Sequence, residues 1–201
     1  PVRDFSTLNG PKAFVREDAS QPVVAFGCFF PSGRAAESPA NRGITELMLR
    51  SMLRGSKRYP GDALLFAIER SGGTVRIVNE PDFFGVVVEV LSRNAELVVP
   101  VLIDMVESPQ FETVAVLGER ERLLADQRPS RVPPSVGAVD LFWQGRYPTH
   151  SYGVAAEGLP ETVAKQTDES VRAWYAKSVQ ALYPLVGIVG DTDGSSLVSR
   201  F

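Results

Sequence analysis

Residues Val23–Phe30 read VVAFGCFF, an almost unbroken apolar run of β-branched and aromatic residues that ends at a Pro-Ser-Gly turn. Such a run predicts a strand that is buried on both faces. From Asn41 onward, apolar residues recur at helical spacing, with Asn41 as a candidate N-cap and Gly55 as a candidate terminator. A buried strand followed by an amphipathic helix is typical of a sheet covered by helices.

Periodicity and turn residues predict the other elements in the same way. Strands are expected at Lys12–Arg16, Thr74–Val78, Phe83–Val90 and Ala181–Val189, and helices at Gly61–Arg70, Ala95–Val106, Glu112–Gln127, Ser135–Gln144 and from Asp168, a candidate N-cap, to Lys177. Residues 145–158 read as a loop. Strands do not alternate one-for-one with helices, so the sequence predicts an α+β fold with helices packed on a mainly antiparallel sheet. No repeat or linker divides residues 1–201, which we expect to form a single domain.

Composition excludes several functions. The 201 residues include 24 acidic and 21 basic side chains, a net charge of −3, which argues against binding to nucleic acid through a basic face. The apolar runs are far shorter than the roughly 20 residues of a membrane span. Cys28 and His150 are the only residues of their types, so neither a multi-cysteine nor a multi-histidine zinc site is available. We expect Cys28 to act as a small buried hydrophobe and His150 as a structural or surface residue.

Residues 43–56 read GITELMLRSMLRGS, and this block resembles the G-x-x-H-x-x-E-H-x-x-x-x-G-T block of the inverzincin peptidases (pitrilysin, insulinase and the mitochondrial processing peptidase) at the same spacing. Matching motifs flank it in the family's order. They are Leu8-Asn9-Gly10, Ser32-Gly33-Arg34 with Glu37, Ile68-Glu69 with Gly72-Gly73, Glu119-Arg120-Glu121, His150-Ser151-Tyr152-Gly153 and Gly187-Ile188-Val189-Gly190-Asp191. The resemblance covers almost the whole chain and implies the family fold, one half of a metallopeptidase clamshell.

In the family, two histidines of the block hold zinc, its glutamate activates water, and a carboxylate from a later helix completes the metal site. The resemblance places Glu46 and Arg50 at the two histidine positions and Leu49 at the position of the base. Asp126, 76 residues after Arg50, falls at the position of the third ligand. Glu119 matches the glutamate that supports the ligands, and it is retained.

These replacements remove the chemistry. A guanidinium has no lone pair and repels a cation, and leucine cannot act as a base. Glu46, Arg50 and Arg54 could alone be the solvated stripe of an amphipathic helix, but the spacing to Asp126 favours a former active site. We therefore expect no catalytic residue, no metal and no cofactor. In place of the metal, we predict that Arg50 bonds Asp126, Glu46 or both.

The resemblance implies a non-catalytic peptidase domain, standing alone or as a piece of a longer two-half chain. Its expected partner is a homologous half or subunit with an intact H-x-x-E-H motif, in a homo- or heterodimer where the two are separate chains. Its expected role is to help bind a peptide or an unfolded protein. The alternative is a purely structural subunit, like the core proteins of the respiratory bc1 complex, which share the fold and have lost the motif.

Overall fold

The computed structural model describes residues 2–6, 11–128 and 134–200. The Leu8-Asn9-Gly10 motif lies outside these residues. The strands are β1 (Arg3–Ser6), β2 (Lys12–Glu17), β3 (Val23–Phe30), β4 (Thr74–Asn79), β5 (Phe84–Leu91) and β6 (Leu185–Gly190). The α-helices are α1 (Ile44–Met52), α2 (Ala63–Arg70), α3 (Ala95–Glu107), α4 (Thr113–Asp126), α5 (Pro134–Arg146), α6 (Pro160–Val163), α7 (Asp168–Tyr175) and α8 (Gly194–Val198). Short 3-10 turns lie at Arg34–Ala36, Ser92–Asn94 and η3 (Ser151–Gly153), and a π-helical turn at Ala176–Gln180 follows α7.

The six strands form one mixed sheet in the order β1-β2-β6-β3-β5-β4. All neighbours pair antiparallel except β2 and β6, which run parallel. The fold class is therefore α+β with a mainly antiparallel sheet, as predicted. Strand β3 has the predicted bounds and lies between β6 and β5.

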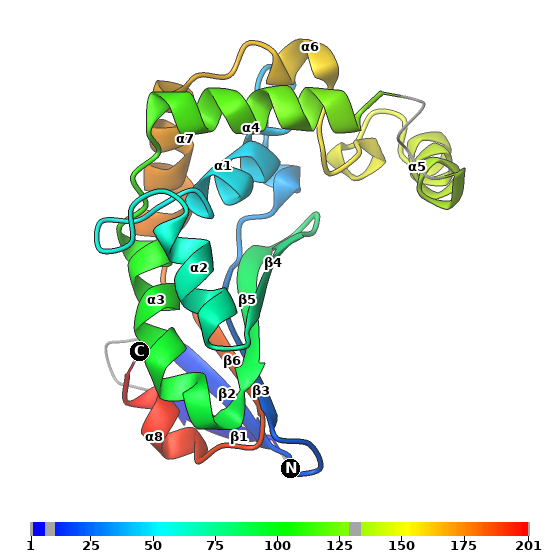
Figure 1. Ribbon diagram of the computed structural model, residues 1–201. Helices are drawn as coiled ribbons and strands as arrows, with labels where there is room; N and C mark the ends of the chain where they lie inside the picture. Colours follow the sequence, from blue (N-terminus) through cyan, green and yellow to red (C-terminus); the bar gives the residue numbers. More distant parts are fainter. Residues whose placement is uncertain (1, 7–10, 129–133, 201) are drawn as a thin grey trace.

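Helices cover one face of the sheet. Helices α1 and α3 contact β5, α2 contacts β4, and α8 contacts β2. Figure 1 shows α2 and α3 on this side of the strands, with α4 and α7 packed beyond α1 at one end of the sheet. The core side chains of β3 on this face are Val24, Phe26, Cys28 and Phe30, and all are buried.

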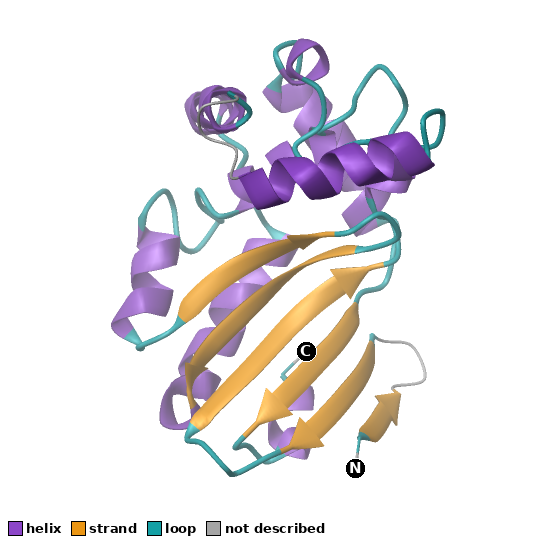
Figure 2. Cartoon of the chain, turned by 90° about the vertical axis from the view of Figure 1, so that its right-hand side faces the viewer, coloured by secondary structure: helices purple, strands orange, loops and turns teal. Residues whose placement is uncertain are grey.

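The opposite face of the sheet is open, and the prediction that β3 is buried on both sides is wrong. Figure 2 looks onto this face, and among the described residues no helix lies over the central strands. Val23 and Val189 are exposed there, while Phe29 is half-buried. The run VVAFGCFF is apolar on both faces, but the described chain covers only one of them.

Two helix starts differ from the prediction. Helix α1 begins at Ile44 after Gly43, whose φ of 91° is a left-handed conformation that favours glycine. The Asn41 carboxamide instead accepts hydrogen bonds from Ser38, so Asn41 is not the N-cap. Thr167 rather than Asp168 caps α7, through a reciprocal capping box with Ser170.

Two later segments differ from the prediction by more than two residues or in type. Strand β6 begins at Leu185 rather than Ala181, because residues 181–184 form the turn between the π-helical segment that follows α7 and the strand. Helix α5 extends to Arg146, and the expected loop at 145–158 contains η3. Gly72, directly after the C-cap residue Ser71 of α2, has a φ of 68°, the left-handed conformation that commonly ends a helix.

Candidate functional site

Helix α1 is almost entirely enclosed. Of its nine residues, all but Arg50 are buried, including the polar Thr45 and Glu46. The Glu37 carboxylate accepts hydrogen bonds from the backbone N–H groups of Gly43 and Thr45, so it supplies acceptors to the start of the helix. Burial raises the pKa of Glu37, although these hydrogen bonds act in the opposite direction. Charged side chains on α1 thus lie against protein, and the solvated-stripe alternative does not hold for Glu46.

Arg50 joins α1 to α4, as predicted. Its Nε donates to Glu46 Oε1 at 2.8 Å, and its Nη1 donates to Asp126 Oδ2 at 2.8 Å. The Arg50 side chain is 23% exposed, that of Glu46 9% and that of Asp126 47%. One guanidinium therefore bridges a buried carboxylate and a half-exposed one.

Asn79, at the end of β4, brings the sheet into the same group. Its Nδ2 donates to Glu46 Oε2 at 3.1 Å and to the backbone oxygen of Ala156 at 3.2 Å. We call Glu46, Arg50, Asn79 and Asp126 the Arg50 cluster. The contact of Asn79 with Glu46 was not predicted, because no local sequence pattern links the end of a strand to a helix more than 30 residues earlier.

The Arg50 cluster favours a charged guanidinium. Burial alone disfavours the cation, but the hydrogen bonds from Arg50 to Asp126 and Glu46 outweigh it and raise the pKa of Arg50 above its ordinary value. The cation is therefore permanent at any physiological pH. It neutralises one of the two carboxylate charges that face it.

Glu119, on α4, belongs to a second group that joins this helix to the turn after α1. Its Oε1 accepts hydrogen bonds from Arg54 Nε and Arg122 Nη1. The Glu119 side chain is 4% exposed, while Arg54 is 31% and Arg122 61% exposed. We call these three residues the Glu119 cluster. Glu119 and Arg54 were both noted in the sequence, but the contacts of Glu119 with Arg54 and Arg122 were not predicted, although Arg122 follows Glu119 at the (i, i+3) spacing of a helical ion pair.

Leu49, between the two charged positions of α1, is fully buried and belongs to the hydrophobic core. It offers neither a charge nor an acceptor to the Arg50 cluster. Of the five positions that the resemblance selects, Glu46, Arg50 and Asp126 are in contact. Glu119 lies in its own group of ion pairs, and Leu49 lies in apolar packing.

The residues of the Arg50 cluster do not fit a zinc ion. Zinc takes histidine, cysteine or carboxylate ligands, and the guanidinium of Arg50 stands between the two carboxylates. Within residues 2–6, 11–128 and 134–200, no group of three histidine, cysteine or acidic side chains is arranged to hold a metal. The same argument opposes a hard cation on the carboxylates of Glu46, Glu119 and Asp126.

The lone histidine and cysteine lie elsewhere. His150 is exposed, its Nδ1 accepts from the backbone N–H of Tyr152, and its ring packs edge-on against the ring of that residue. Cys28 is buried in β3, and burial raises the pKa of its thiol to about 12. Both environments are those of structural residues.

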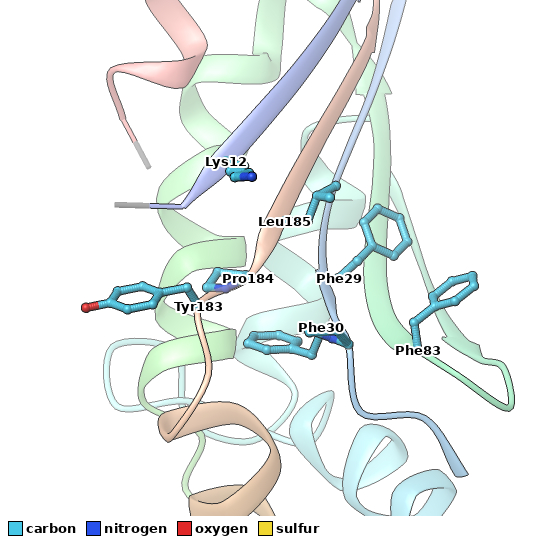
Figure 3. A pocket seen from close by; sticks show the side chains of 8 residues that line it. Lys12, Phe29, Phe30, Phe83, Tyr183, Pro184 and Leu185 are labelled. Atoms are coloured by element: carbon cyan, nitrogen blue, oxygen red, sulfur yellow. The ribbon is translucent and has the colours of Figure 1, made fainter. Parts of the chain in front are cut away.

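A large apolar hollow lies on the open face of the sheet, and no residue of the Arg50 cluster lines it. It has a volume of about 740 Å³ and is lined by Phe29, Phe30 and Pro31 of one segment, Tyr183, Pro184 and Leu185 of another, and by Lys12 and Phe83. Figure 3 shows Phe29, Phe83 and Leu185 pointing out from neighbouring strands and strand ends. Its lining offers large apolar side chains and one lysine, which suits apolar contact rather than catalysis.

Comparison with known proteins finds one matching family and relatives that align over most of the chain. Residues 12–131 match the family described as Insulinase (Peptidase family M16). The uncharacterized zinc protease YmxG of Bacillus subtilis is 21% identical over 173 residues, which are 86% of this chain and 42% of that protein. Subunit 1 of the mitochondrial cytochrome b-c1 complex of Caenorhabditis elegans is 20% identical over 203 residues, which are 100% of this chain and 43% of that subunit.

Solved structures share the fold at similar identity. A peptidase M16 inactive domain from Pseudomonas fluorescens superposes with a TM-score of 0.85 at 21% identity, over 100% of this chain and 49% of that one. Pitrilysin superposes with a TM-score of 0.84 at 18% identity, over 100% of this chain but 22% of its own. The chain thus spans less than half the length of these relatives.

Proposed function

Because the chain belongs to the insulinase family of peptidases, peptidase family M16, we propose that it is a non-catalytic domain of such a peptidase. In this proposal residues 1–201 form one metallopeptidase-like domain. The domain pairs with a zinc-bearing homologous half or subunit and helps to bind a peptide substrate. Any proteolysis comes from that partner.

One observation carries the proposal: Arg50 bonds Glu46 and Asp126 at the positions that the family resemblance assigns to the metal ligands. A guanidinium presents five donors and no acceptor, so it satisfies the two carboxylates that remain and leaves no room for a cation between them. The buried Leu49 at the position of the base supplies no proton acceptor. Arg50 at one ligand position and Leu49 at the position of the base are thus side chains without the required chemistry.

The edge of the sheet supports a role in peptide binding. Strand β4 is at the end of the strand order, so one of its edges has no strand beside it among the described residues. Such an edge can accept an extended peptide as an added strand. Asn79, the last residue of β4, contacts the Arg50 cluster, so a peptide on this edge would pass beside it.

The lengths of the relatives support the pairing. Both the b-c1 subunit and the Pseudomonas domain are about twice as long as this chain, and pitrilysin is longer still. Those proteins therefore contain more than one unit of this size. We infer that this domain also works beside further units, either in one polypeptide or as a separate subunit.

A second candidate function is a structural subunit without a substrate. The similarity to subunit 1 of the cytochrome b-c1 complex extends over the whole chain and favours it. No helix within the described residues has the length and apolar character required to cross a membrane. A measurement of peptide binding distinguishes the two candidate functions, because a purely structural subunit does not need to bind a peptide.

The first test measures how much zinc the chain binds. The chain is equilibrated with zinc, dialysed and analysed for bound metal, and we expect far less than one zinc per chain. A triple variant, Glu46→His with Arg50→His and Asp126→Glu, restores the ligand types and should retain about one zinc. Its matched control carries Asp126→Ala instead and should bind zinc more weakly. Stoichiometric zinc in the unsubstituted chain, lost on Glu46→Ala, would contradict the proposal, as would a folded triple variant that binds none.

The second test measures whether the chain binds a peptide and whether it cleaves it. Fluorescence anisotropy with a labelled unstructured peptide should show saturable binding without cleavage, and a chelator should not change it. Binding without hydrolysis supports the non-catalytic domain. Absence of binding points to the structural subunit, and chelator-sensitive hydrolysis by the homogeneous chain overturns both.

A further inference from the structure

A second hollow, of about 300 Å³, lies between α7 and the start of α1. We call it the α7 hollow. Helix α7 and the π-helical turn after it supply four lining residues at positions (i, i+3, i+4, i+7), which share one helix face. These are Ser170, Ala173, Trp174 and Lys177, and Asn41, Ile44 and Gln166 complete the described lining. Small-molecule sites have volumes of roughly 300–1,000 Å³, so this hollow suits a small ligand.

Trp174 brings an unused hydrogen-bond donor to the α7 hollow. The residue is 6% exposed, and its Nε1 is buried without a hydrogen-bond partner among the described residues. A buried indole N–H usually has a partner, because leaving such a donor unsatisfied is unfavourable. The structure therefore holds a donor that lacks an acceptor, in the wall of a hollow large enough for a ligand.

Lys177 is the one charged residue of the described lining. Its Nζ lies 5.1 Å from the centroid of the Trp174 ring, a cation–π contact. No acidic side chain within the described residues forms an ion pair with it. The ammonium therefore has an aromatic partner but no counter-charge.

The side-chain oxygens of the α7 hollow are already hydrogen-bonded. Asn41 Oδ1 accepts from the backbone N–H and the hydroxyl of Ser38, and Gln166 Oε1 accepts from the Ser170 hydroxyl. The Ser170 hydroxyl in turn accepts from the backbone N–H of Thr167 in the capping box. A lining whose acceptors are occupied and whose free groups are donors favours a ligand that accepts hydrogen bonds and carries negative charge.

We propose that the α7 hollow binds a carboxylate with a short apolar body, either a small free acid or the C-terminal residue of a peptide. The carboxylate accepts a hydrogen bond from Trp174 Nε1, pairs with Lys177 and accepts a further bond from Asn41 Nδ2. The apolar body lies against Ile44 and Ala173. One ammonium with two neutral donors suits a singly charged group better than a phosphate, for which arginine is the typical partner.

Binding requires a side chain of the lining to move, because Trp174 Nε1 is now out of reach of water. Lys177 is exposed and has a flexible four-carbon stem, so its ammonium can leave the ring and turn toward the carboxylate. The ion pair then replaces the cation–π contact. The indole N–H gains the acceptor that it lacks.

This inference goes beyond the proposed function and does not rest on it. The α7 hollow shares no described lining residue with the Arg50 cluster or with β4. A zinc-free chain that binds no carboxylate therefore contradicts only this inference. A chain that binds both a carboxylate and stoichiometric zinc contradicts only the proposed function.

The indole N–H of Trp174 reports binding directly. The chain has two tryptophans, so Trp143→Phe leaves Trp174 as the source of the only indole signal in proton–nitrogen NMR spectra. Titration with butyrate at constant ionic strength should move this signal saturably, with a dissociation constant on the order of 1 mM. Butyramide, the uncharged isostere, should bind at least about tenfold more weakly. Equal responses to the two ligands, or a response that sodium chloride reproduces, would overturn the proposal.

Two further ligands distinguish the sources of the carboxylate. They are acetylated alanyl-valine with a free C-terminus and the same dipeptide with an amidated C-terminus. Tighter binding of the free dipeptide than of butyrate assigns the site to peptide C-termini, and the reverse assigns it to small acids. Both results support a carboxylate site. Equal binding of the free and amidated dipeptides contradicts it.

Substitution of the lysine tests the ion pair. Lys177→Met keeps the stem without the charge and should raise the dissociation constant for butyrate by about tenfold or more. Lys165→Met is the matched control, because Lys165 is also exposed and precedes α7 but does not line the hollow. It should leave the dissociation constant unchanged, and circular dichroism checks that both variants fold. Equal weakening by the two substitutions would indicate general charge attraction and overturn the proposal, as would butyrate binding that Lys177→Met does not weaken.

Discussion

Helices α1 and α4 are joined by two groups of ion pairs that differ in burial. In the Arg50 cluster, one arginine bridges two carboxylates, of which Asp126 is half-exposed. In the Glu119 cluster, two arginines converge on one carboxylate that is almost fully buried. Arg50 lies on α1 and Arg54 in the turn directly after it, and their acceptors Asp126 and Glu119 are two turns apart on α4, so both groups connect the end of α1 to α4.

The comparison shows why Asp126 and Glu119 should differ in how well each position tolerates substitution. Removing a charge from water costs free energy, and hydrogen bonds and ion pairs with partners that remain in place must offset that cost. Glu119 depends on its two arginines for this, whereas Asp126 can exchange its partner for water. Asp126 is therefore the position where a different side chain can be tolerated at small cost to the fold, and Glu119 is the position where it cannot.

The largest expected effect is in the Glu119 cluster. Replacing both arginines, Arg54→Ala with Arg122→Ala, leaves the Glu119 carboxylate buried without a counter-charge, which should lower the free energy of unfolding by about 3–5 kcal/mol. Urea unfolding followed by circular dichroism measures it. The control pair Arg54→Lys with Arg122→Lys keeps both charges and should lose much less. A loss below about 1 kcal/mol for the alanine pair would show that Glu119 is not held by these arginines.

Much of the fold could be predicted because its signals are local. The apolar run of β3 gave its bounds to the residue, and the 3.6-residue periodicity located α1, α3 and α4. The open face could not be predicted, because an apolar strand face looks the same in sequence whether its cover is in the same chain or in another one. The helix start at Gly43 was missed because its left-handed backbone and the distant Glu37 carboxylate, rather than a local Asn41 cap, begin α1.

In the candidate site, too, some contacts could be predicted from the sequence and others could not. The contact of Arg50 with Glu46 follows from their (i, i+4) spacing, and the contact with Asp126 from the long separation that the family resemblance supplies. Asn79 and Arg54 carry no such signal, since their contacts arise only when the sheet and α4 are placed against α1. Long-range polar contacts depend on packing, which a single sequence does not encode in any local pattern.

Arg50→Ala should lower the free energy of unfolding by less than the double substitution in the Glu119 cluster. The Glu46 carboxylate is 9% exposed and would keep only the Asn79 amide as a donor among the partners described here. Leaving a buried acceptor under-satisfied costs about 1–3 kcal/mol, which urea unfolding can resolve. The double variant Arg50→Met with Glu46→Gln removes both charges and should recover most of the loss. If the double variant were less stable than Arg50→Ala, the unpaired charge would not be the cause.

Asn79 should contribute less than Arg50 to the free energy of unfolding. Its amide donates one hydrogen bond to Glu46 and one to the Ala156 backbone, so Asn79→Ala should cost about 1 kcal/mol. A double-mutant cycle with Glu46→Gln isolates the bond between the two side chains. A coupling energy near zero would mean that Asn79 acts only through Ala156, and that β4 is not tied energetically to the Arg50 cluster.

The smallest effect should come from Asp126→Asn. The Asp126 side chain is 47% exposed, so its ion pair with Arg50 competes with water and should add less than about 1 kcal/mol. Added salt screens such a pair, and the difference between Asp126→Asn and the unsubstituted chain should shrink between low salt and about 1 M. Glu119→Gln is the matched comparison on the same helix, because its buried charge is shielded from ions and its cost should change little with salt. Equal salt dependence for the two substitutions would mean that burial does not separate the clusters, and Asp126 would then have to be as tightly held as Glu119.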